Sequence, residues 1–102
     1  MPMGIQEPLE KLAQKYPDLA KVSAVEVIKR RIALLEREKK SLEEEINALE
    51  MRYGDLEEYE RRMGDSLEEH EVWIRWKALK DELRSLEEEL VDLKELLEEI
   101  TG

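Results

Sequence analysis

The strongest constraint on the fold is a heptad pattern of apolar residues that runs through most of the chain. Apolar side chains recur at alternating spacings of three and four from residue 25 to residue 56, interrupted by Lys39 alone, and again from residue 72 to residue 100. Heptads sustained over more than about four repeats are typical of coiled coils. The pattern therefore predicts two long amphipathic helices. Their apolar core positions are Val25, Ile28, Ile32, Leu35, Leu42, Ile46, Leu49, Tyr53 and Leu56, then Val72, Trp76, Leu79, Leu83, Leu86, Leu90, Leu93, Leu97 and Ile100.

Composition limits the kind of assembly that these helices form. Charged residues make up 43% of the 102 residues and aromatic residues 5%, which suits either a disordered chain or a solvated helical assembly. Because 18 of the 19 core positions are apolar, the pattern favours the helical assembly. Glutamate is abundant while asparagine and glutamine total three, a mix typical of thermophilic proteins.

Charge, cysteine content and hydropathy disfavour several kinds of partner, site and location. A formal net charge of −10 disfavours direct binding to nucleic acid or to anionic membranes. The chain has no cysteine for disulfides or thiolate metal sites, and no apolar run near the roughly 20 residues of a membrane span. The N-terminal residues lack the basic and apolar regions of a signal peptide. We therefore expect a soluble cytoplasmic protein.

The segment between the two heptad patterns contains the elements of a turn. Gly54 and Gly64 stand where the C-terminus of a helix favours a left-handed residue. Each is followed by a capping-box sequence, beginning at Asp55 and at Ser66. A continuous helix would place both glycines in its interior, at a cost of about 1 kcal/mol each. We therefore predict that the chain turns back here through a short helix.

The distribution of charge favours an antiparallel pairing. Residues 22–40 carry +3 from six basic and three acidic side chains, and residues 84–102 carry −5 from two basic and seven acidic ones. An antiparallel hairpin sets these segments side by side, whereas a parallel partner would set +3 against +3. We predict a register in which the numbers of facing residues sum to about 125, so that Leu35 lies beside Leu90. Sliding one helix along the other by one heptad would still place apolar residues opposite apolar residues. The register is therefore predicted from matching the two ends of the helices.

The predicted fold is all-α: an antiparallel two-helix coiled-coil hairpin with a short N-terminal helix. Residues 22–102 form the hairpin. Its helices are expected at about 23–53 and 67–101, with a short helix and turn at about 54–66.

The N-terminal residues 1–21 are predicted to be a separate short helix and linker. Pro8 suits the first turn of a helix, and Pro17 is expected to end it. Ser23 and Glu26 then form a capping box at the start of the first long helix.

Apolar residues outside the core positions widen the hydrophobic faces beyond a two-helix stripe. We interpret them as a surface that contacts a second copy, giving a homodimeric four-helix bundle, or that contacts a different protein. Aromatic residues such as Trp73 often anchor binding patches. The candidates for partner or dimer contact are Val27, Leu34, Tyr59, Met63, Trp73, Ile74, Val91 and Leu96.

Residues suited to catalysis or metal binding are sparse. His70 is the single histidine and cysteine is absent, so the sequence shows no convincing Ser-His-Asp or Cys-His arrangement. Glu68-x-x-Glu71 and Glu89-x-x-Asp92 are similar to the magnesium-binding pattern of all-helical nucleotide pyrophosphatases. Both pairs fall on one predicted helix, about 30 Å apart at about 1.5 Å per residue, so they cannot share a metal within one chain. We expect a protein that is not an enzyme and uses no cofactor or metal.

The stretch RYGDLEEYERRM and the helix after it resemble a pattern in small archaeal and prokaryotic antitoxins of type II toxin–antitoxin systems. There a long helix ends in an aromatic-glycine pair, followed by a short Glu-Glu-aromatic helix and by an amphipathic helix with an acidic stretch and a tryptophan. The matching residues are Tyr53, Gly54, Glu57, Glu58, Tyr59, the run from Glu68 to Glu71, and Trp76. The resemblance covers about residues 50–80. It implies a non-catalytic protein whose acidic helices bind and neutralise a basic toxin, often a ribonuclease.

The two long helices are also similar to those of prefoldin-type chaperones. Prefoldins insert β-strands between their helices, whereas residues 54–69 are polar and rich in helix caps. The favoured function is therefore protein binding with a basic protein partner. An oligomeric assembly scaffold or a prefoldin-like holdase chaperone is the alternative.

Overall fold

The structure is a computed structural model that describes residues 6–102, and within this range every regular element is a helix. The helices are α1 (Gln6–Lys15), α2 (Pro17–Tyr53), α3 (Leu56–Arg62) and α4 (Leu67–Thr101). The prediction of an all-α fold is confirmed. Residues 1–5 of the predicted N-terminal segment lie outside the described residues.

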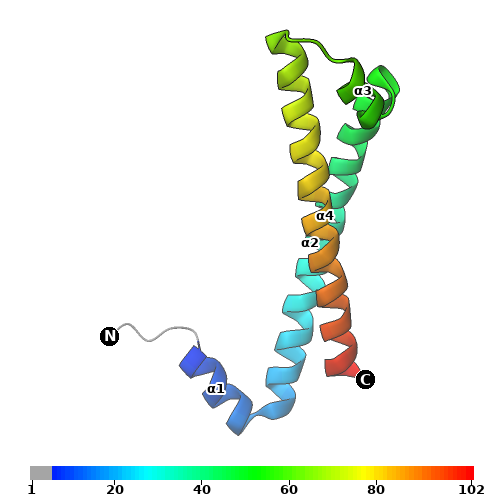
Figure 1. Ribbon diagram of the computed structural model, residues 1–102. Coiled ribbons are helices and arrows are strands. Elements are labelled where there is room, and N and C mark those ends of the chain that lie inside the picture. Colours follow the sequence, from blue (N-terminus) through cyan, green and yellow to red (C-terminus); the bar gives the residue numbers. More distant parts are fainter. Residues whose placement is uncertain (1–5) are drawn as a thin grey trace.

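The two long helices, α2 and α4, lie along each other and run in opposite directions (Figure 1). The molecule is correspondingly elongated, with extents of 63 × 36 × 16 Å. Helix α3 packs against α2 and α4 at the end where the chain reverses, which we call the turn end. At the opposite end, the open end, α2 begins and α4 stops.

The core follows the heptad pattern. All 18 apolar core positions are buried or half-buried, and none is exposed. One cluster fills the middle of the α2/α4 contact and includes Leu35, which is 2% exposed. A second cluster joins α3 to the two long helices around Trp76. Lys39, the polar residue in the pattern, is half-buried. The apolar spacing thus identified the faces on which the long helices pack.

Helix α2 begins earlier than predicted. It starts at Pro17 instead of about residue 23, so the predicted linker and the capping box at Ser23 are wrong. Pro17 separates α1 from α2 as expected, but it also opens α2, because a proline needs no hydrogen-bond partner for its nitrogen in the first turn. The following residues, including Ala20 and Ala24, favour a helix, so nothing interrupts it at Ser23.

The predicted caps at the turn end are largely present. The Asp55 side chain accepts a hydrogen bond from the Glu57 amide at 3.4 Å, and that of Ser66 accepts one from the Glu69 amide at 3.1 Å. Gly54 ends α2 with φ of 83°, a conformation that side chains rarely adopt. The left-handed conformation expected at Gly64 is absent, because α3 ends one residue earlier in an extended conformation at Met63.

Helix α1 leans away from the long pair at the open end, and within the described residues it packs only against the start of α2 (Figure 1). Its apolar face is therefore only partly covered: Leu9 is 53% exposed, and Tyr16, which follows α1, is 60% exposed. A helix of this length is marginal alone, so its position depends on its connection to α2.

Candidate protein-binding surface

The turn end is closed by an aromatic cluster of Tyr53, Tyr59 and Trp76. Trp76 is fully buried, and its ring centroid lies 5.7 Å from that of Tyr59 and 6.3 Å from that of Tyr53. Tyr59 is 8% exposed, and its hydroxyl donates a hydrogen bond to the Glu69 carbonyl oxygen at 2.9 Å. The assignment of Tyr59 as a contact residue is therefore corrected, because α3 folds onto α4 and buries this ring within its own chain.

Trp73 and Met63 lie half-buried at the edge of the aromatic cluster. The Trp73 indole N–H donates to the Glu60 carboxylate at 2.9 Å, and the Lys77 ammonium lies 5.3 Å from the centre of the ring system. These contacts hold Trp73 against α3 while part of its ring remains accessible. Both residues can therefore contribute an edge, but not a centre, to a contact surface.

The other five candidates are exposed. They fall into three places: Val27 and Leu34 on α2, Ile74 near the turn end of α4, and Val91 and Leu96 near its open end. Their exposed fractions are 65% for Val27, 40% for Leu34, 59% for Ile74, 55% for Val91 and 42% for Leu96. Ile74 borders a shallow groove with Ala78, and Val91 borders one lined by charged side chains. Whether these residues contact a partner stays a prediction.

Several further exposed apolar residues lie outside the eight candidates. They are Tyr16, Leu19, Val22, Met51 and Leu67, of which Met51 is 90% exposed. Leu19 and Val22 escaped notice because the start of α2 was placed too late. Met51 could have been found, since it lies outside the core positions of a predicted helix.

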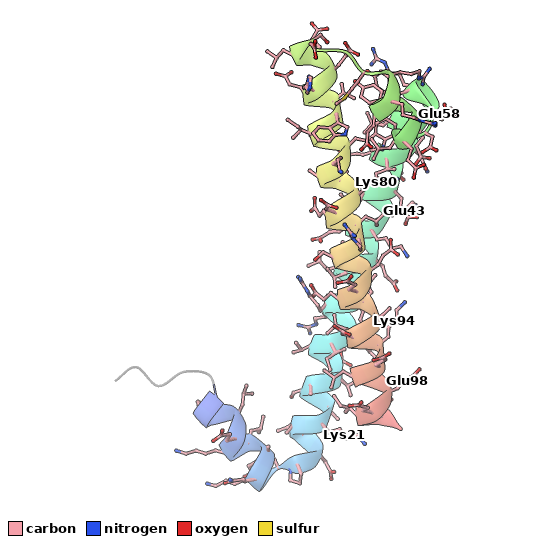
Figure 2. All side chains as sticks on the ribbon, viewed as in Figure 1. Lys21, Glu43, Glu58, Lys80, Lys94 and Glu98 are labelled. Carbon is pink, nitrogen blue, oxygen red and sulfur yellow. The ribbon has the colours of Figure 1, made fainter. Side chains whose placement is uncertain are left out.

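Three ion pairs connect α2 to α4. Arg31 donates from Nε to Glu89 Oε2 at 2.8 Å, Arg75 lies 3.3 Å from Glu45, and Lys94 lies 3.2 Å from Glu36. The hydrogen bond from Arg31 lowers the pKa of Glu89. All six side chains are substantially exposed, so each pair contributes modestly to stability. Other charged side chains, such as Glu43, Lys80 and Glu98, lie on the surface of the two long helices (Figure 2).

Glu69 ties the loop between α3 and α4 to the start of α4. Its carboxylate accepts hydrogen bonds from the Gly64 amide and from the Ser66 hydroxyl, both at 2.8 Å. The Ser66 hydroxyl oxygen in turn accepts from the Glu69 amide, as the N-cap side chain of a capping box does. These bonds favour the carboxylate form and lower the pKa of Glu69, the Gly64 amide having the largest effect.

We expect the stability supplied by Glu69 to depend on pH. Because its pKa is lower in the folded chain than the ordinary value of 4.5, this stability is present above pH 4.5 and disappears as the pH falls through the folded value. Glu69→Gln should therefore lower the midpoint of thermal unfolding at pH 7, and by less at pH 3. Glu68→Gln on the same turn is the control. Equal shifts for the two variants would contradict this role for Glu69.

His70 and the acidic pairs do not assemble a metal or catalytic centre in the described residues. His70 is half-buried, and its Nδ1 lies 3.0 Å from the Ser66 carbonyl oxygen, to which it can donate. Within residues 6–102 no group of three or more histidine or acidic side chains converges in a way that could hold a metal ion. Nor is any helix of that range both long and apolar enough to span a membrane.

Comparison with known proteins adds no relative. No protein-family model matches the chain, and neither a curated protein nor a solved structure matches it.

Proposed function

We propose that α2 and α4 form an antiparallel coiled-coil hairpin and that two copies associate as a four-helix bundle. The ion pairs support the hairpin register. The residue numbers sum to 120 for Arg31 with Glu89 and for Glu45 with Arg75, and to 130 for the third pair. In an antiparallel coiled coil, ion pairs flank the apolar core on both sides. The residue numbers of the pairs on one side sum to less than those of the facing core residues, and on the other side to more. Sums of 120 and 130 therefore agree with the predicted value of 125. The exposed apolar residues support the association.

The function that the geometry supports best is non-catalytic protein binding, with a basic protein as partner. The observation that carries this proposal is an exposed apolar face at the start of α4, beside acidic side chains such as Glu71. Leu67 and Ile74 are seven residues apart on one side of α4 and are 74% and 59% exposed, and the half-buried Trp73 precedes Ile74. Apolar anchors within an acidic rim suit a basic surface, because the rim steers association and the anchors supply affinity.

The resemblance of residues 50–80 to type II antitoxins makes a small basic toxin the first partner to test. Such a partner would be neutralised by being covered, with no chemistry required of this chain. The net charge of −10 favours rapid association with a protein of opposite charge.

A binding experiment tests this proposal. The tagged chain is purified from its native cells, the protein that accompanies it is produced separately, and the two are mixed in a calorimeter. We expect a basic partner whose affinity falls at least about tenfold with Ile74→Asp, because a charge would then be buried in the interface. Val91→Asp is the matched control, since Val91 is equally exposed but lies near the open end. Equal effects of the two variants, or an acidic partner, would reject the proposal.

An assembly scaffold or prefoldin-like holdase is the second candidate. It is favoured by the further exposed apolar residues at the open end, Tyr16, Leu19 and Val22, which are 60%, 54% and 58% exposed. A holdase suppresses aggregation of unrelated unfolded proteins, whereas a specific binder of one basic partner does not. A light-scattering assay with several unfolded clients separates the two functions.

A further inference from the structure

Near the open end, α2 carries an exposed face that combines apolar and basic side chains. We call it the basic strip: Val27, Arg30, Leu34 and Arg37. The spacing of three and four residues places all four on one side of the helix. All four are exposed, and within the described residues neither arginine has an acidic partner within 4.0 Å. Both arginines of the strip are therefore available for contacts outside their own chain.

Near the same end, α4 carries a face of the opposite charge. We call it the acidic strip: Glu88, Asp92, Glu95, Leu96 and Glu99. Its members are exposed and share one side of α4 by helical spacing. Its acidic side chains likewise have no basic partner within 4.0 Å in the described residues. Each strip thus offers an apolar contact next to charges that the other strip would neutralise.

The apolar residues of the two strips lie toward the same side of the molecule. Val27 is one helical turn before Arg31, so these two residues lie on the same side of α2. Leu96 is two turns after Glu89, so these two lie on the same side of α4. The Arg31–Glu89 ion pair joins the two helices on that side. That ion pair joins α2 to α4 along one edge of their contact. A second molecule can therefore cover both strips from one direction.

In the predicted register, the two strips also lie at the same position along the helix axes. With facing residues that sum to 125, Arg30 lies level with Glu95, and Arg37 lies level with Glu88. A two-fold axis parallel to the helices keeps every residue at the same position along that axis. It also places α2 of one copy over α4 of the other. Such an axis sets Arg30 beside the other copy's Glu95, and Arg37 beside its Glu88, twice in each dimer.

We infer that the basic strip of one copy docks on the acidic strip of a second copy, with Val27 and Leu34 covering Leu96. The inference rests on the proposed homodimer and specifies its faces. Packing α2 on the α2 of the second copy would set Arg30 and Arg37 against like charges, which disfavours that arrangement.

Charge reversal tests the arrangement. Two double variants are made, Arg30→Glu with Arg37→Glu, and Glu88→Arg with Glu95→Arg. In a homodimer of either variant, all four pairs of facing charges between the copies become pairs of like charge. The dissociation constant of that homodimer should therefore rise at least about tenfold. Mixing the two variants restores opposite charges at every position. We expect a heterodimer about as tight as the wild-type dimer, measured by sedimentation equilibrium, with circular dichroism confirming that each variant is folded.

Two results would overturn this arrangement. If the wild-type chain dimerises and the reversals have no effect, or if mixing restores nothing, the faces are wrong while the homodimer and the partner binding proposed above stand. If the wild-type chain is monomeric at all concentrations, the homodimer itself fails together with this arrangement. The calorimetric test at the turn end then decides partner binding independently.

Discussion

Replacing Trp76 with alanine is expected to lower the free energy of unfolding by about 3–5 kcal/mol, the usual cost of removing a buried aromatic side chain. Trp76 is the largest fully buried side chain and joins α3 to both long helices. One effect opposes this loss. The indole N–H of Trp76 has no hydrogen-bond acceptor within the described residues, and removing such a donor recovers about 1–3 kcal/mol. The transfer and cavity costs are larger, so the variant should still be strongly destabilised.

Two control variants separate burial from other effects at Trp76. Trp73→Ala makes the same change at a half-buried neighbour and should cost clearly less than Trp76→Ala. Trp76→Phe keeps a ring in the cluster and removes the unpaired donor, so it should restore most of the lost stability. Urea unfolding monitored by circular dichroism measures all three. Equal losses for Trp73→Ala and Trp76→Ala would mean that the turn end is packed differently.

Replacing Leu35 with alanine is expected to cost about 2–5 kcal/mol, because this side chain is 2% exposed in the middle of the α2/α4 contact. Leu34 offers a matched control. It is the adjacent residue on the same helix and is 40% exposed, so Leu34→Ala should cost well under half as much in a monomeric chain. Both are measured by urea unfolding at protein concentrations low enough to exclude dimers. A larger loss for Leu34→Ala would show that α2 packs through a different face.

The sequence was most informative where a pattern repeats. Every apolar heptad position is buried or half-buried, because a long helix has one way to cover a continuous apolar stripe. The caps at Asp55 and Ser66 were also predictable, since a polar side chain there meets amides that lack partners.

Local motifs were less reliable where tertiary context decides. Ser23 and Glu26 have the residue types of a capping box, yet the helix passes through them because Pro17 already starts it. Gly64 was expected in a left-handed conformation, but Met63 ends α3 in an extended one.

The candidate surface was predictable in part. Val27, Leu34, Ile74, Val91 and Leu96 lie outside the heptad core and are exposed. Tyr59 also lies outside the core pattern, but the short α3 folds back and buries it, which helical periodicity in α2 and α4 could not indicate.

A distance between spin labels at residues 26 and 98 tests most directly whether α2 and α4 lie side by side. Glu26 and Glu98 are exposed, near the open end, and outside both strips, and the chain has no cysteine, so single labels can be placed cleanly. Labelled chains are diluted into an excess of unlabelled ones to remove distances between copies. The paired helices predict a distance of roughly 15–25 Å, given an interaxial spacing of about 10 Å plus the two label arms. A distance near the roughly 100 Å that a straight helix would span between these residues would contradict the fold.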